Sequence, residues 1–262
     1  MPVQLTTAAQ ITEQINMLAQ SDSPSEMEIR RVRREIDKVK AADAAQHYML
    51  LGMLCAVVGD GDECRANHDR SLRLSGDTVF LLNYSFSLKR LGATGEALQH
   101  LLRAFELTPT ERVFAEVAQA MLYSGDLREY DRVLERFIKS NPGVSVDSIH
   151  SAKYIKNFRS CLERAGVSLA DFRVAMQLVE NVLVRAHVRP ALEAIKFASA
   201  SFSGVQHVSI KILMSGRAVE KLVDLNEDIA DAMADAVEIE AWNRLVFNVT
   251  ECTEQDRAAD VA

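Results

Sequence analysis

Hydrophobic residues recur at helical spacing along most of the chain, in stretches separated by glycine, proline and short polar runs. In one stretch, Tyr48, Leu51, Gly52 and Cys55 lie at positions i, i+3, i+4 and i+7, which form one face of a helix, and Gly59 then interrupts the pattern. Further stretches with helical spacing are 7–20, 27–42, 147–164 and 168–186. The pattern therefore predicts a predominantly helical chain before residue 192.

Glycines in this helical region recur at a constant distance. Gly59, Gly92 and Gly125 are 33 residues apart. Two further series keep the same step: Gly52, Ser85 and Ala118, and Gly76, Pro109 and Pro142. A period of this length predicts helical hairpins that bury their apolar faces against neighbouring hairpins, here at 45–77, 78–110 and 111–143. The alternative is an irregular helical bundle, which nine positions in register disfavour.

The small residues of the second series have a structural interpretation of their own. Gly52, Ser85 and Ala118 occupy the same place in successive units. A bulky side chain at a close helix crossing would force the two helices apart. We therefore expect each of these residues to lie where the two helices of its hairpin cross.

The residues in these units resemble the tetratricopeptide repeat family, which carries a large residue, Leu-Gly, two alanines and a closing proline at fixed places. The second unit matches through Tyr84, Gly92, Ala97, Ala104 and Pro109. The other units depart at the alanine and proline places: Cys64, Ser71 and Gly76 in the first, and Tyr130 and Phe137 in the third. The resemblance implies an array whose first helices line a concave groove for a partner protein.

The resemblance also implies which side chains face that groove. They are Met49, Met53, Leu82, Phe86, Lys89, Arg90, Arg112, Gln119 and Tyr123. An apolar, Met-containing floor with a basic rim suits an amphipathic helix or an extended peptide that has hydrophobic anchors and some acid. We therefore expect a non-enzymatic adaptor, chaperone or inhibitor. Coverage of part of this surface by the chain's own helices is the alternative.

The pattern changes to period two after residue 192. Residues 195–201 and 207–213 alternate apolar with polar side chains and predict a β-hairpin, followed by an amphipathic helix near 216–235 and a third strand at 244–250. Together these elements predict a mostly α chain, in which the array precedes a small α+β domain whose helices cover one face of the sheet. The expected domains are 1–43 (capping helices), 44–143 (three repeats) and 144–262 (helices plus the α+β domain with an acidic tail).

Charge is segregated along the chain. The net charge is −7, which argues against nucleic acid or an anionic membrane as the main partner. Residues 30–40 carry six cations and two acids, whereas residues 220–262 carry twelve acids and three bases. This distribution suggests intramolecular attraction or a head-to-tail homodimer, and solvated helix faces with i, i+4 ion pairs such as Arg31 to Glu35 are the alternative.

The sequence offers little catalytic chemistry. It contains no phosphate-binding glycine loop, HExxH, GxSxG or paired Cys/His set, so we expect no catalytic residue, metal or cofactor. Its four cysteines are expected to be buried thiols, and the first twenty residues and the absence of a long apolar run favour a cytoplasmic protein. The alternative function is a regulator whose α+β domain binds a nucleotide or nucleic acid, with Ser215, Gly216 and Arg217 offering backbone amides to an anion.

Overall fold

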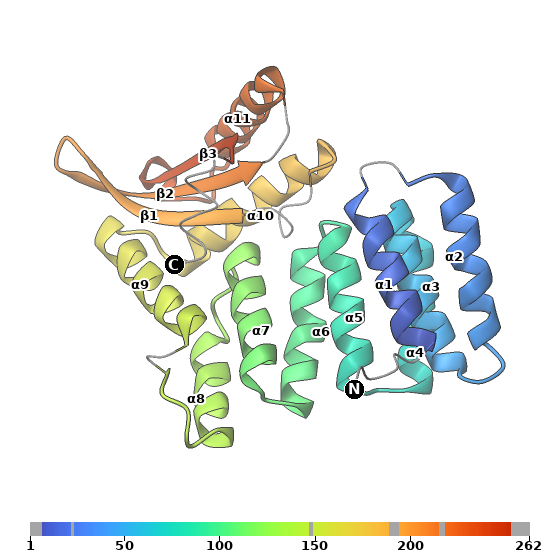
Figure 1. Ribbon diagram of the computed structural model, residues 1–262. Coiled ribbons are helices and arrows are strands. Elements are labelled where there is room, and N and C mark those ends of the chain that lie inside the picture. Colours follow the sequence, from blue (N-terminus) through green and yellow to red (C-terminus); the bar gives the residue numbers. More distant parts are fainter. Residues whose placement is uncertain (1–6, 22–23, 147–148, 189–193, 215–217, 253–262) are drawn as a thin grey trace. The chain divides into compact units, whose positions relative to one another are not determined.

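The computed structural model describes residues 7–21, 24–146, 149–188, 194–214 and 218–252 (Figure 1). The chain divides into two compact units, Met1–Thr108 and Pro109–Ala262. This boundary falls inside the predicted repeat array, between its second and third hairpins. The observed architecture is helical with a small carboxy-terminal sheet, which confirms the predicted fold class.

The first unit consists of helices joined by short turns. Its elements are α1 (Thr7–Gln20), α2 (Glu26–Val39), α3 (Ala44–Val58), α4 (Gly61–Leu74), α5 (Thr78–Arg90) and α6 (Thr94–Leu107). Side chains cap several of these helices. Ser25 and Glu28 form a reciprocal capping box at the start of α2, and the carboxylate of Asp43 accepts a hydrogen bond from the backbone N–H of Gln46 at the start of α3.

The glycines of the 33-residue series adopt the backbone conformation that ends a helix. Gly59, Gly92 and Gly125 have φ values of 83°, 80° and 70°, in the left-handed region that a residue with a Cβ rarely occupies. Each follows the first helix of a hairpin, α3, α5 or α7 (Glu111–Ser124). The period of the sequence therefore corresponds to a recurring turn between paired helices.

The core of the first unit extends from α1 through α3. Ile11 and Ile15 of α1 pack with Ile36 of α2 and with Leu50 and Met53 of α3. Figure 1 shows α1 lying beside α2 and α3. The amino-terminal helices thus bury their apolar stripes against the first hairpin.

The second unit combines helices with the sheet. Its elements are α7, α8 (Tyr130–Ser140), α9 (His150–Ala165), α10 (Leu169–Arg185), β1 (Ala194–Phe202), β2 (Val205–Met214), α11 (Val219–Ala234), the short 3₁₀ helix η3 (Trp242–Arg244) and β3 (Leu245–Glu251). Aromatic rings separate α7 from α8: the Phe114 centroid lies 4.7 Å from that of Phe137 and 6.4 Å from that of Tyr130. The backbones of α7 and α8 accordingly approach each other at fewer places than those of α3 and α4.

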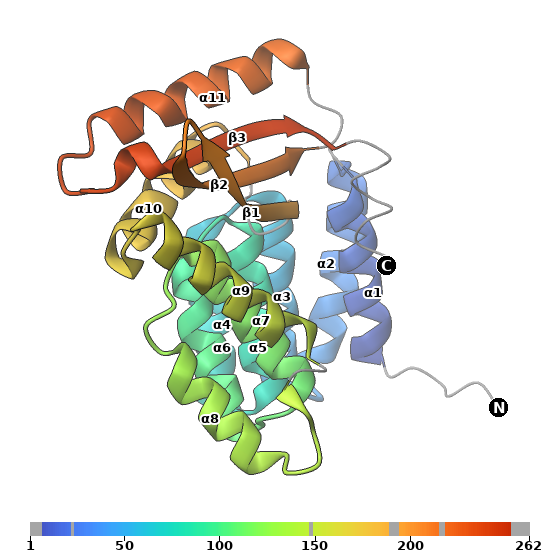
Figure 2. The same cartoon turned by 90° about the vertical axis from the view of Figure 1, so that its left-hand side faces the viewer.

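The sheet has the strand order β1-β2-β3. β1 and β2 form the predicted hairpin, whose two-residue turn, Ser203-Gly204, has positive φ at both residues. β3 pairs with β2 in parallel, and α11 makes the crossover between them. Figure 2 shows α11 running along β3.

Helices cover one face of the sheet, as predicted. Ile210 and Ile212 of β2 are buried on that face, and Phe197 of β1 packs against Phe158 of α9 and Phe172 of α10 at ring-centroid distances of 4.5 and 6.0 Å. Residues on the opposite face are largely exposed: Ala198, Lys211, Val246 and Asn248. Because side chains alternate along a strand, this one-sided burial follows from the period-two pattern.

Within the described ranges, no helix combines the length and the apolar character needed to cross a bilayer. The four cysteines are free thiols, and burial raises the pKa of Cys64 to about 12.

Candidate functional site

The structure places the first two predicted groove residues in the core. Met49 and Met53 are buried against α1, in the cluster that contains Ile11 and Ile15. Met49 and Met53 therefore do not line the open groove that the sequence predicted. The apolar stripe of α1 covers the side of α3 that was expected to face a partner. The amphipathic pattern of α1 predicted a buried face, but it did not say against which helix.

The predicted residues on α5 are only partly exposed. Leu82 is half-buried, and Phe86 keeps 39% of its surface exposed with the Lys89 Nζ 5.1 Å from its ring centroid. Lys89 itself is buried, and the Arg90 guanidinium donates a hydrogen bond of 2.7 Å to the carbonyl oxygen of Ala19 near the end of α1. These two cations stabilise the unit and do not form the open basic rim that was expected.

The predicted residues on α7 lie at an open site. Arg112 is exposed at its amino-terminal end, and Gln119 and Tyr123 border a hollow of about 720 Å³ between α7, α9 and the start of β1. The lining residues are Ala115, Glu116, Gln119, Leu122, Tyr123, His150, Ser151, Tyr154, Ile195, Lys196 and Phe197. All of them belong to the second unit.

This hollow combines an apolar surface with hydrogen-bonding groups. Leu122, Ile195 and Phe197 supply apolar side chains, and Gln119 and Tyr123 supply an amide and a phenol. Such a mixture of apolar area and a few polar groups is typical of binding pockets.

Tyr154 joins the helical wall of the hollow to the sheet. Its hydroxyl accepts a hydrogen bond of 3.0 Å from the backbone N–H of Phe197, and the two rings lie 6.2 Å apart, edge to face. The ring of His150, one turn earlier on α9, stacks on the ring of Tyr154 with centroids 6.1 Å apart. The edge of β1 opposite β2 therefore borders the hollow, and the Phe197 N–H on this edge is hydrogen-bonded to α9 through Tyr154.

Sequence reasoning missed the contributions of α9 and β1. Tyr154 was recognised only as part of a helical stripe, and Phe197 only as part of a strand. Their proximity to Gln119 depends on how α9 and the sheet pack against α7, and no local spacing encodes that.

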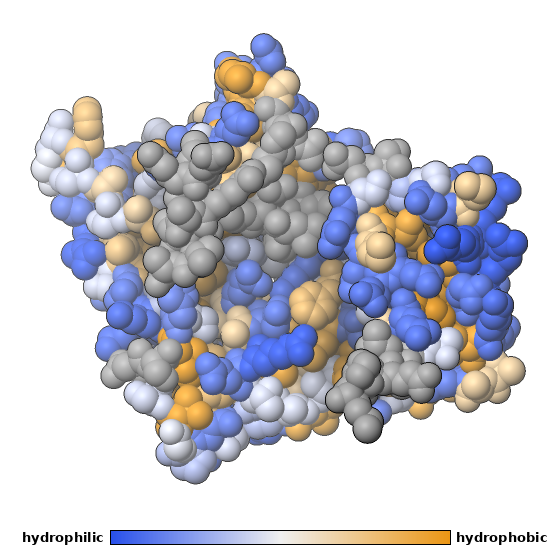
Figure 3. Space-filling view, in the orientation of Figure 1, coloured by the Kyte–Doolittle hydropathy of each residue, from blue (hydrophilic) through white to orange (hydrophobic). Residues whose placement is uncertain are grey.

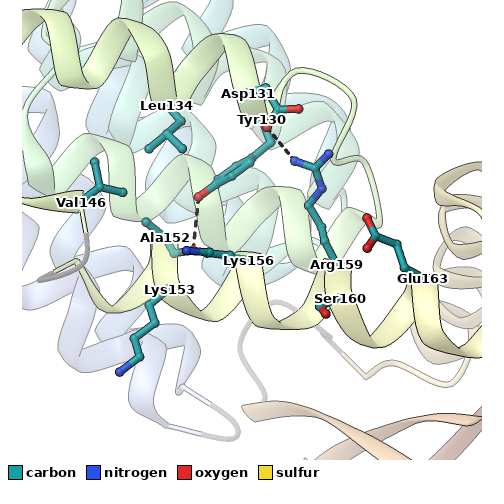
Figure 4. Close-up of a pocket in the computed structure, with 10 residues that line it drawn as sticks. All are labelled: Tyr130, Asp131, Leu134, Val146, Ala152, Lys153, Lys156, Arg159, Ser160 and Glu163. Atoms are coloured by element: carbon teal, nitrogen blue, oxygen red, sulfur yellow. Dashed lines mark hydrogen bonds and ion pairs between the residues drawn. The ribbon is translucent and has the colours of Figure 1, made fainter. Parts of the chain in front are cut away.

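A smaller pocket of about 350 Å³ lies between α8 and α9 (Figure 4). The Arg159 guanidinium in its wall pairs with the Asp131 carboxylate at 2.6 Å, and the Tyr130 hydroxyl donates to the carbonyl oxygen of Ala152 at 3.4 Å. Burial raises the pKa of Tyr130 to about 12, so its hydroxyl stays protonated at neutral pH. The Arg159–Asp131 and Tyr130–Ala152 contacts in this pocket therefore join α8 to α9.

Two histidines of the first unit, His68 and His100, pack against the ring of Tyr84. The His68 ring stacks on Tyr84 with centroids 4.6 Å apart, and the tilted His100 ring has its centroid 4.1 Å from that of Tyr84. Burial, with a smaller effect of His100, lowers the pKa of His68 to about 3, so His68 is neutral at physiological pH. No cluster of three His, Cys, Asp or Glu side chains suited to a metal occurs among the described residues.

The anion site suggested at Ser215, Gly216 and Arg217 lies outside the described residues. Family models, curated proteins and solved structures contain no match to this chain.

Proposed function

We propose that this protein is a non-enzymatic interaction protein that binds a segment of a partner protein in the hollow between α7, α9 and β1. The observation that carries the proposal is the hollow itself: two of the residues expected to contact a partner, Gln119 and Tyr123, border it. Its volume of about 720 Å³ lies inside the range of roughly 300–1,000 Å³ that is usual for ligand-binding pockets.

We also propose that α3 to α8 are tetratricopeptide-like units. The supporting observations are the recurring left-handed glycines and the burial of Gly52, Ser85 and Ala118. In arrays of this kind the first helix of each hairpin presents its exposed side chains to the ligand. The hollow is consistent with that role, because α7 is the first helix of its hairpin.

The chemistry of the hollow favours a segment with one large apolar side chain flanked by main-chain hydrogen-bonding groups. The apolar side chain would contact Ile195 and Phe197, and the main chain of the segment would meet the amide of Gln119 and the phenol of Tyr123. Peptide-binding sites commonly divide the two tasks in this way, with main-chain bonds giving affinity and pockets giving specificity.

The test is to fill the hollow. Ala115 is a small, half-buried residue in its wall, so Ala115→Trp would place an indole where the partner side chain is expected. The matched control is Gln177→Trp, which places the same ring on an exposed position of α10. A peptide-display library selected on the wild-type protein supplies the ligands, and their dissociation constants are measured for all three proteins.

The expected result is that the selected peptides share a large apolar residue, and that Ala115→Trp weakens their binding by about tenfold or more, since a blocked hot-spot pocket costs at least 1.4 kcal/mol. Gln177→Trp should leave binding unchanged. Peptides that bind the wild type and Ala115→Trp equally well would refute the assignment of the binding site to this hollow.

A further inference from the structure

Helix α11 presents a continuous acidic stripe. Leu222, Leu225, Ile229 and Met233 form its buried side. The acids on its exposed side and at its carboxy-terminal cap are spaced at i, i+4, i+7, i+8, i+11 and i+15: Glu220, Asp224, Glu227, Asp228, Asp231 and Asp235. Lys221 is the one cation in this helix.

This stripe is unfavourable for an isolated helix. Like charges at i, i+4, such as Asp224 and Asp228, repel and lower helix stability, and Asp231 and Asp235 lie at the negative end of the helix dipole. None of the six acids has an ion-pair partner in the part of the chain that the structure describes. A cationic surface that met the stripe would relieve this repulsion.

Helix α2 carries five cations and four acids, and the face opposite its buried residues is cationic: Arg30, Arg31, Arg34 and Lys38 lie there. Its exposed side has a hollow of about 720 Å³, lined by Glu26, Met27, Arg30, Arg33, Arg34 and Asp37. Hydrophilic side chains dominate the surface over α2, at the right of Figure 3.

Only some of these cations are paired along the helix. The ion pairs that form are Arg30 with Glu26 and Lys38 with Glu35, each at 2.6 Å, and not the Arg31 to Glu35 pair suggested by the sequence. Arg33 and Arg34 have no ion-pair partner among the described residues.

The two stripes match in spacing as well as in sign. Cations at 30, 31, 34 and 38 have the same intervals as acids at 227, 228, 231 and 235. Each stripe also has an exposed apolar residue near the start of its helix, Met27 (76% exposed) on α2 and Val219 (65% exposed) on α11. Two helices with these faces can pair their charges in one contact.

We propose that α2 of one copy of this chain docks on α11 of a second copy, so that a two-fold dimer contains the contact twice. A second copy is the occupant because its charges are complementary: each chain carries both stripes. Arg31 and Arg34 on α2 and the six acids of α11 have no ion-pair partner among the described residues. This inference does not depend on the proposed peptide site on α7.

Sedimentation velocity of the full chain at increasing concentration tests the proposal. We expect a dimer whose dissociation constant rises steeply when NaCl is raised from about 50 mM to about 500 mM, because salt screens exposed charges over these distances. The variants Arg33→Glu/Arg34→Glu and Asp224→Lys/Asp228→Lys should each weaken the dimer by about tenfold or more. The control Arg73→Glu/Arg103→Glu reverses two exposed cations elsewhere and should leave it unchanged.

Mixing the two reversed variants is the decisive step. In a mixed dimer the reversed α2 meets the reversed α11 in one contact, and the other contact joins two unchanged helices. Both contacts then have opposite charges, and association should return to near the wild-type affinity. Each reversed variant alone, at the same total concentration, is the control and should stay weakly associated. Circular dichroism checks that every variant is folded.

Three results would overturn the proposal. One is a wild-type protein that stays monomeric at every concentration, which includes the case in which α2 and α11 pair within one chain. Another is a dimer that neither reversal weakens. The third is a mixture of the reversed variants that associates no better than each variant alone.

Discussion

A Cβ atom placed on Gly52 would lie 2.4 Å from Cδ2 of His68, closer than any two such atoms can approach. Gly52 on α3 thus provides the space that the imidazole of α4 fills. The small residue expected at this helix crossing is required by a particular neighbour.

Gly52→Ala should therefore lower the free energy of unfolding by about 1–3 kcal/mol through overpacking, although alanine favours a helix over glycine by roughly 1 kcal/mol. Urea denaturation measures the change. In a His68→Ala background the clash is gone, so Gly52→Ala should be neutral or stabilising there. An equal loss in both backgrounds would show that the imidazole is not the cause.

Buried His68 should make the protein sensitive to acid. Its pKa is about 3 in the folded state and 6.5 in the unfolded state, so between these pH values the unfolded chain binds a proton that the folded chain does not. Stability is therefore full above pH 6.5 and falls by about 1.4 kcal/mol per pH unit as the pH drops toward 3.

Urea denaturation of the wild type and His68→Gln at pH 7, 6 and 5 isolates this effect, since glutamine does not titrate. The variant should lose less stability on acidification than the wild type. Parallel pH dependences for the two proteins would mean that His68 is protonated in the folded state as readily as in the unfolded chain.

Asn226 closes the edge of β3. Its side-chain amide donates to the carbonyl oxygen of Val249 and its oxygen accepts from the Val249 N–H, both at 2.8 Å. Asn226→Leu should lower the free energy of unfolding by about 1–3 kcal/mol and expose a strand edge that promotes aggregation. Thermal unfolding with light scattering measures both effects, and Asn248→Leu on the exposed face of the sheet is the control. If Asn248→Leu lowered the free energy of unfolding as much as Asn226→Leu, the two hydrogen bonds of Asn226 would not be the cause of the loss.

Met53 and Phe86 should behave differently, although both were predicted to line the groove. Met53→Ser removes a side chain buried against α1 and should lower the free energy of unfolding by about 2–4 kcal/mol. Phe86→Ser changes a partly exposed ring and should cost less than about 1 kcal/mol. Chemical denaturation of the two variants measures the difference. A loss of several kcal/mol in the free energy of unfolding of Phe86→Ser would show that this ring belongs to the core.

Local patterns carried most of the information about the elements. Left-handed glycines such as Gly59 end helices by their own backbone freedom, and the period-two stretch of β1 forms a strand with one buried face. These properties depend on residues close together in the chain, so helices, hairpin turns and the third strand could be predicted from the sequence. The assignment of the hairpins to the tetratricopeptide family stays a prediction.

The sequence by itself determined which faces of these helices are apolar and where the chain turns. Only the tertiary structure decided what each face meets: α1 covers Met53, Arg90 reaches the end of α1, and Tyr154 brings β1 to the hollow beside α7. The physical reason is that hydrophobic burial is non-directional. An amphipathic stripe specifies that a surface leaves water, and the choice of partner depends on the shape and packing of residues distant in the chain.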